Sequence, residues 1–176
     1  GIDLFRVFDC LNWVPNMRVA MDAVAQEDKI CEAAICYTGD ILNSARPKYD
    51  LKYYVAMLKE LEAAGAHMIA IKDMAGLLKP AAASVLFRTL REETDLALHF
   101  HTHDTSGIAA ATILAAIDAG VDAVDASMDA LSGLTAQPCL GSIAEALTGT
   151  RRDPGLDPEW IRRISFYWEA VRHQYA

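Results

Sequence analysis

The feature that most constrains the fold is a strand-like segment followed by a helix-like segment, repeated with a period of about 30 to 35 residues. Short apolar runs alternate with amphipathic stretches, and Gly65 and Gly120 stand where two of the helices are predicted to end. Five consecutive units of this kind predict a parallel β-sheet covered by helices, which is an α/β fold. The predicted units span residues 2–28, 29–65, 66–94, 96–120 and 121–150.

Two α/β architectures fit such a pattern, an open doubly wound sheet and a (β/α)₈ barrel. The positions of the polar residues favour the barrel, because a barrel collects side chains from the carboxyl ends of several strands at one mouth. Polar residues follow nearly every predicted strand: Asp9 and Asn12, Thr38 and Asp40, Lys72 and Asp73, His101 to Asp104, and Asp125 to Asp129. A complete barrel needs about 250 residues, so the five units predict a partial TIM barrel that belongs to something longer.

The sequence changes character after residue 150. Residues 151–160 are rich in turn-forming residues, and residues 159–175 are predicted to form a helix with aromatic residues at helical spacing. We therefore expect residues 1–150 to form the barrel part. Residues 151–176 are expected to form a linker and the start of a C-terminal helical extension, whose aromatic stripe packs in a core or an interface.

Charge and hydropathy exclude some classes of function. The net charge of −8 argues against non-specific binding of nucleic acid. No apolar run reaches the roughly 18 residues that a membrane span needs. The four cysteines lack CxxC spacing, and Cys10, Cys31 and Cys36 lie in or beside apolar runs. They are therefore expected to be reduced core residues of an intracellular protein.

The segment LHFHTHDTSG, residues 98–107, places histidine at every second position. Alternation along a strand puts His99, His101 and His103 on one face. Two histidines at the end of such a strand can reach one ion, and imidazole suits Zn²⁺, with Mn²⁺ or Co²⁺ as alternatives. The competing interpretation is that His101 and His103 are hydrogen-bonded residues at a barrel rim. His99, which lies deeper, is expected to support the site or the core.

Lys72 strengthens the metal hypothesis. In the preceding strand, alternation places Met68, Ala70 and Lys72 on the face with small residues, which tends to point into a barrel. Desolvation and a nearby cation both favour the neutral amine of such a lysine. A neutral amine can capture CO₂ as a carbamate, whose oxygens can bind a cation.

Several other polar residues are expected to have structural roles. His67 and His173 are expected to be structural or surface residues. Arg6, which comes early in the first predicted strand, is expected to form an ion pair, and Thr135 in the loop GLTAQP to cap a turn.

Five segments together carry a resemblance to a known family. FRVFDCLN, AAICYTGD, IKDMAGLLKP, HFHTHDTSG and DALSGLTAQP, in this order and spacing, resemble the carboxyltransferase domain of pyruvate carboxylase. The resemblance covers residues 1 to 150 and continues weakly into the tail. It implies a divalent metal held by an aspartate, a carbamylated lysine and two histidines. The lysine falls on Lys72 and the histidines on His101 and His103. The aspartate has no counterpart here, because the chain resembles the family from its fourth strand onward.

The resemblance also implies an activity and partners. It implies transfer of CO₂ from carboxybiotin to pyruvate, giving oxaloacetate, with biotin on a carrier domain outside this chain. It implies a homo-oligomeric parent protein in the cytoplasm, or in the mitochondrial matrix of a eukaryote, with neither nucleic acid nor membrane as a partner. The alternatives are a related biotin-dependent decarboxylase or transcarboxylase subunit, a metal-dependent aldolase or lyase on the same barrel, and an inactive barrel fragment.

Overall fold

The fold is organised by a five-stranded sheet, which the computed structural model shows within residues 1–175, the part of the chain that it describes. The helices are α1 (Val14–Gln26), α2 (Leu51–Ala63), α3 (Pro80–Glu93), α4 (Ala109–Asp118), α5 (Leu140–Leu147) and α6 (Pro158–Arg172). The strands are β1 (Leu4–Phe8), β2 (Ile30–Cys36), β3 (Met68–Asp73), β4 (Ala97–Thr102) and β5 (Ala123–Val124). Three short 3₁₀ turns, η1 (Pro47–Tyr49), η2 (Asp104–Ser106) and η3 (Asp129–Leu131), lie in the connections.

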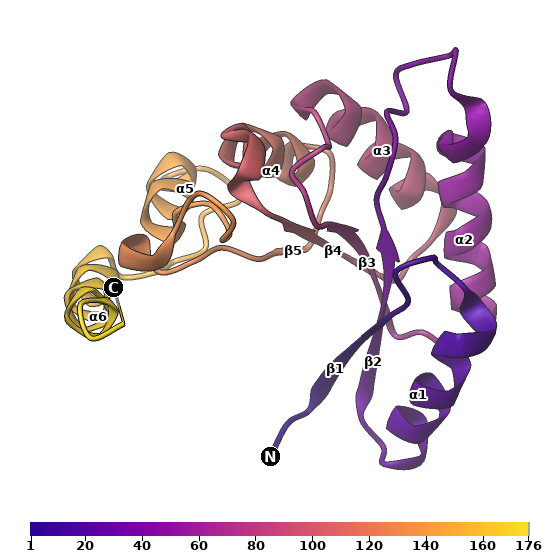
Figure 1. Cartoon of the computed structure of the whole chain (residues 1–176), viewed down its shortest axis with the longest axis horizontal. Helices are drawn as coiled ribbons and strands as arrows, with labels where there is room; N and C mark the ends of the chain where they lie inside the picture. The colour runs from indigo at the N-terminus through magenta and orange to yellow at the C-terminus, as the bar shows by residue number, and fades with distance from the viewer. Residues whose placement is uncertain (176) are drawn as a thin grey trace.

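The strand order distinguishes the two architectures that the sequence left in competition. All strand pairs are parallel, and each strand lies beside the next one in the chain, in the order β1-β2-β3-β4-β5. A doubly wound sheet would reverse its strand order at a switch point, whereas a barrel keeps the sequential order. Helices α1 to α4 lie on one side of the curved sheet, and among residues 1–175 the opposite, concave side carries no helix (Figure 1). The partial TIM barrel is thus confirmed.

The helices that cover the sheet begin at local signals in the sequence. Asp50 caps α2, because its side chain accepts a hydrogen bond from the backbone N–H of Tyr53. Pro80 occupies the first turn of α3, where its missing N–H costs no hydrogen bond. The left-handed conformation of Gly65 and Gly120, with φ of 93° and 106°, lets the chain leave α2 and α4 and enter the next strand.

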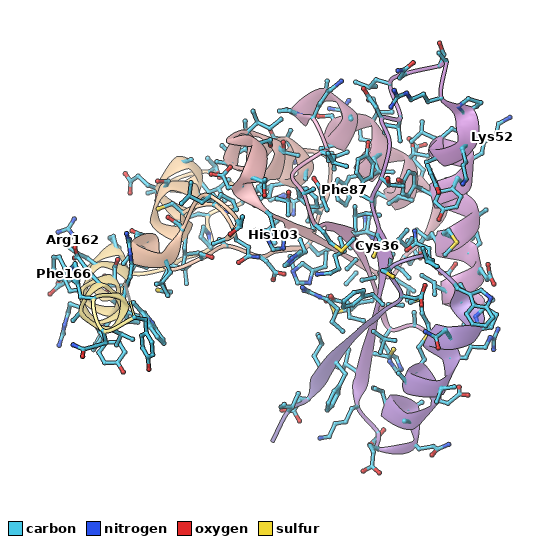
Figure 2. All side chains as sticks on the ribbon, in the orientation of Figure 1. Cys36, Lys52, Phe87, His103, Arg162 and Phe166 are labelled. Carbon is cyan, nitrogen blue, oxygen red and sulfur yellow. The ribbon has the colours of Figure 1, made fainter. Side chains whose placement is uncertain are left out.

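The main hydrophobic core lies between the sheet and these helices. Ile69, Ile71, Leu98 and Phe100 alternate along β3 and β4 on the outer face, and all four are buried in the core cluster. The ring of Phe100 packs against that of Phe87 of α3, with 5.2 Å between ring centroids. Figure 2 shows Phe87 between its helix and the sheet, and His103 on the concave side. The alternation predicted from the sequence is therefore correct.

One expectation about buried residues needs correction, and a second is tested only in part. Cys31 and Cys36 are buried as expected, but Cys10 is exposed, because it follows the end of β1 in a turn outside the helical cover. Helix α6 lies apart from the sheet (Figure 1), and Ile161 is its one buried residue. Its Trp160 and Phe166 are exposed, so the aromatic stripe does not pack in the core of the described residues, and its packing in an interface stays a prediction. Within those residues, no helix is long and apolar enough to cross a membrane.

Candidate metal centre

The register of the sheet brings two of the predicted site residues together. Lys72 of β3 is paired with His101 of β4, directly across the carboxyl-terminal edge of the two strands. Both side chains lie on the inner, concave face, because their neighbours Ile71 and Phe100 point into the core. His101 is almost fully buried, whereas His103 follows the end of β4 and is more accessible. The sheet thus places the predicted residues at the mouth of the barrel segment.

The rings of His101 and His103 face one another through one nitrogen each. The two Nε2 atoms lie 3.0 Å apart. On the other side of each ring, Nδ1 has a hydrogen-bond acceptor. His101 Nδ1 lies 2.6 Å from Oδ2 of Asp125, and His103 Nδ1 lies 2.6 Å from the backbone carbonyl oxygen of Thr135. A carboxylate and a carbonyl can only accept, whereas Arg6 Nη1, which can only donate, lies farther from His101 Nδ1, at 3.2 Å. The shorter contacts therefore assign the proton of each ring to Nδ1.

This choice of tautomer leaves a lone pair on each Nε2. Two lone pairs at this separation repel, so the pair is stable only when a proton or a cation lies between them. Two nitrogens that each lie about 2.0–2.1 Å from one Zn²⁺ are roughly 3.0–3.4 Å apart, which is the spacing seen here. A histidine that ligates a metal usually donates its other N–H to a carboxylate or a carbonyl, as both histidines do. The donor set therefore fits a divalent metal such as zinc.

A cluster of charged side chains lies directly beneath the histidine pair. Arg6 forms ion pairs with Glu32 and Asp125, at 2.7 Å from Nη1 to Oδ2 for the second pair. His99 lies between the same two carboxylates, with Nδ1 2.7 Å from Glu32 Oε2 and Nε2 2.9 Å from Asp125 Oδ1. Each ring nitrogen of His99 lies closer to a carboxylate acceptor than to Arg6 Nη2, which is 3.2 and 3.4 Å away. This is the geometry of a charged imidazolium. The cluster thus contains two positive and two negative groups.

The pKa values of this cluster follow from its geometry. Burial opposes the charged form of His99, but its hydrogen bonds to Asp125 and Glu32 outweigh burial and raise its pKa to about 9. Burial alone would raise the pKa of Asp125, yet hydrogen bonds from His101, His99 and Arg6 hold it well below the usual range. Burial opposes ionisation of Glu32 as well, and its bonds with His99 and Arg6 lower its pKa. All four groups are therefore charged near neutral pH.

Lys72 lies on the inner face, as predicted, but its amine points toward Phe8 of β1. Its Nζ lies 4.8 Å from the ring centroid of Phe8 on β1, as a cation–π contact. Within residues 1–175, no group of three or more His, Cys, Asp or Glu side chains is arranged to hold a metal. Within the described residues, the two histidines are therefore an incomplete ligand set.

Three contributors to the site were given no such role from the sequence, although Asp125 was expected at the barrel mouth. Glu32 stands in the middle of an apolar strand, and its charge among Cys and Ala residues was the available signal. Asp125 follows a strand of only two residues, which is too short to show alternation. Thr135 contributes its backbone carbonyl rather than the turn cap that was expected of its side chain, and no side-chain pattern reveals such a role. The ion pair expected of Arg6 is present, and His67 is structural, since its Nδ1 accepts a hydrogen bond from the backbone N–H of Cys31.

Comparison with known proteins places this chain in a family. The sequence pattern of the HMGL-like family matches residues 15–167, which is most of the chain. The chain belongs to the HMGL-like family. It is 52% identical over its whole length to pyruvate carboxylase of Bacillus subtilis. It is 48% identical to mitochondrial pyruvate carboxylase of Homo sapiens.

Solved structures also show similarity between this HMGL-like chain and pyruvate carboxylase. It is 81% identical to the carboxyl transferase domain of Rhizobium etli pyruvate carboxylase, a structure described as containing pyruvate and biocytin. The TM-score is 0.98, and the match covers 99% of this chain and 30% of the other. The chain spans 15% of the length of the two curated relatives named above. It therefore corresponds to a segment of those proteins.

Proposed function

We propose that this chain forms part of the carboxyltransferase barrel of a biotin-dependent pyruvate carboxylase. The proposed reaction moves a carboxyl group from carboxybiotin to pyruvate, which gives oxaloacetate. The observation that carries the proposal is the pair of imidazole Nε2 atoms, 3.0 Å apart at the carboxyl-terminal edge of the sheet. The 81% identity to a carboxyl transferase domain described with pyruvate and biocytin supports the choice of substrates.

His101, His103 and a carbamate on Lys72 are the proposed holders of a divalent metal, with zinc first and manganese or cobalt as alternatives. Carbamate formation joins the neutral Lys72 Nζ to the carbon of CO₂ and releases one proton. Counted from the ammonium form, two protons leave in all, and a cationic side chain becomes an anionic oxygen donor. A bound divalent cation supplies Lewis-acid stabilisation of the negative charge that develops on the pyruvate enolate.

The residues of the chain itself have three tasks in this proposal. Asp125 and the carbonyl of Thr135 orient the two imidazoles through their Nδ1 protons. Ala34 and Ala70, paired across β2 and β3 and both fully buried, keep water from the inner face at their own positions. The inner face of β1 carries the ring of Phe8, which is half-exposed and shields the amine of Lys72 on one side. Exclusion of water matters, because free CO₂ and an enolate are both lost to it.

The partners follow from the reaction. Biotin is proposed to arrive on a carrier domain outside this chain, and pyruvate to bind at the mouth formed by the strand ends. The edge strands β1 and β5 each have one neighbour within the described residues. The rest of the barrel is proposed to pair with these edges, in a full-length protein that forms a homo-oligomer.

One experiment tests the proposal in the full-length protein, purified without chelator. Elemental analysis is expected to find about one divalent metal per chain, and the protein is expected to carboxylate pyruvate when supplied with carboxybiotin. A protein that binds the metal but cleaves a 2-oxo acid without using carboxybiotin would instead be a lyase on the same barrel. A protein without metal would contradict the proposed centre.

A further inference from the structure

We infer that Asp125 is a positioning residue for the metal centre, which fixes His101 in the orientation and tautomer that a metal needs. This inference rests on the proposed function, because it concerns the same histidine pair. It goes further by assigning a role to a residue that is not itself a ligand. The carboxylate of Asp125 touches the far side of the His101 ring, away from Nε2.

The carboxylate of Asp125 is held from three directions. Its Oδ2 accepts hydrogen bonds from His101 Nδ1 at 2.6 Å and from Arg6 Nη1 at 2.7 Å, and its Oδ1 accepts one from His99 Nε2 at 2.9 Å. The donors come from β1 and β4, whereas Asp125 directly follows β5. Because three fixed donors surround it, the carboxylate has little freedom to rotate.

Glu32 closes the cluster on the side away from the histidine pair. Its side chain is fully buried and binds both Arg6 and His99, the two cations that also hold Asp125. Buried charges are stable only when they are paired and hydrogen-bonded, and here each positive group contacts both negative groups. In the part of the chain that the structure describes, no buried side-chain N or O atom lacks a hydrogen-bond partner. The cluster is therefore a rigid support that links β1, β2, β4 and the residue after β5.

The two histidines are supported unequally. His103 donates to a neutral backbone carbonyl in a loop, whereas His101 donates to a carboxylate that the cluster immobilises. Hydrogen bonds to a charged acceptor are roughly twice as strong as neutral ones. His101 is thus the more rigid of the two donors, and the negative charge of Asp125 partly offsets the charge of a cation bound at Nε2.

The test compares two substitutions in the full-length protein. Asp125→Asn and Glu32→Gln each remove one carboxylate from the same cluster, but only Asp125 contacts His101. Both proteins are loaded with Co²⁺, and the rate of metal loss to a chelator and the visible absorption spectrum are recorded. Asp125→Asn is expected to weaken metal retention 10- to 100-fold, as removal of such a partner typically does, and to shift the absorption bands. Glu32→Gln is expected to change retention less than about 3-fold.

The outcomes separate this inference from the proposed function. Wild-type protein that holds metal, with an Asp125→Asn variant that retains it equally well, overturns the inference and leaves the metal centre intact. Equal losses in the two variants also overturn it, because Asp125 would then act only through the stability of the cluster. Wild-type protein that binds no metal overturns both.

A second measurement needs no substitution and covers the case in which Asp125→Asn does not fold. In metal-free wild-type protein with ¹⁵N-labelled histidine, at a pH where the His101 ring is neutral, the nitrogen shifts report which nitrogen carries the proton. The inference requires the proton on Nδ1 of His101. A proton on Nε2 overturns it.

Discussion

On the outer face of the sheet, Ile71 and Phe100 are buried under helices, whereas the very next residues, Lys72 and His101, stand on the inner face among charged groups. On the outer face, residues are held by apolar packing, whose energy depends little on the orientation of the side chains. The inner face holds Arg6 by directed ion pairs, which fail if one partner is missing. The same strands therefore provide a stable support on one side and a precisely oriented site on the other.

The largest effect is expected on the inner face. Lys72→Gln is expected to lower the rate of carboxyl transfer at least about 10³-fold and to leave the unfolding midpoint nearly unchanged, because Gln cannot form a carbamate. The measurement is an oxaloacetate-coupled assay in the full-length protein. Lys52→Gln, at an exposed position of α2 that Figure 2 labels, is the matched control and is expected to retain full activity. Normal transfer by the Lys72 variant would eliminate the carbamate.

Substitution of a histidine is expected to remove the metal without removing the fold. His101→Ala or His103→Ala is expected to lower the metal content of the purified protein more than about 10-fold, since each loses one of two directed nitrogen donors. Plasma emission spectrometry measures the content. His67→Ala is the control, because His67 bonds a backbone N–H near the start of β2 and lies away from the pair. Equal metal in all variants would place the ion elsewhere.

On the outer face the expected effect is on stability. Phe100→Ala is expected to lower the free energy of unfolding of the barrel by about 3–5 kcal/mol, because a fully buried ring that packs against Phe87 leaves a cavity. Denaturant titration measures the change. Phe8→Ala, on the inner face and 46% exposed, is expected to cost less than about 1.5 kcal/mol. If Phe100→Ala and Phe8→Ala lower the free energy of unfolding by the same amount, the outer face is not more tightly packed than the inner face.

The smallest effect is a dependence of stability on pH that comes from His99. Its pKa is raised from 6.5 to about 9 in the folded protein, so its stabilising contribution is complete below about pH 6.5 and is lost as pH rises through 9. The expected loss is on the order of 2–3 kcal/mol for metal-free protein. Denaturation midpoints at pH 6 and pH 10 measure it. His99→Gln is expected to flatten the slope, and an unchanged slope would show that His99 is neutral when folded.

Much of this contrast between faces could be predicted from local sequence patterns. Alternation in residues 98–103 correctly separated the histidines from Leu98 and Phe100, and the five-unit repeat correctly indicated a barrel segment. These predictions succeeded because strand periodicity and helix signals act over a few residues.

The support of the site could not be predicted in the same way. Glu32 and His99 are 67 residues apart in sequence, and Arg6 and Asp125 are 119 apart. Such contacts depend on the register between strands, which one strand's pattern does not specify. The carbonyl of Thr135 reaches His103 only through the path of its loop, and the direction of the Lys72 amine depends on Phe8 of a different strand.

Anomalous X-ray scattering from crystals of the full-length protein, grown without chelator, tests the central claim most directly. The account predicts a peak about 2.0–2.2 Å from Nε2 of both His101 and His103, with planar density that extends Lys72 Nζ toward the peak. A metal-replete crystal with no peak between the two rings, or with an unmodified Lys72 still over Phe8, would contradict it.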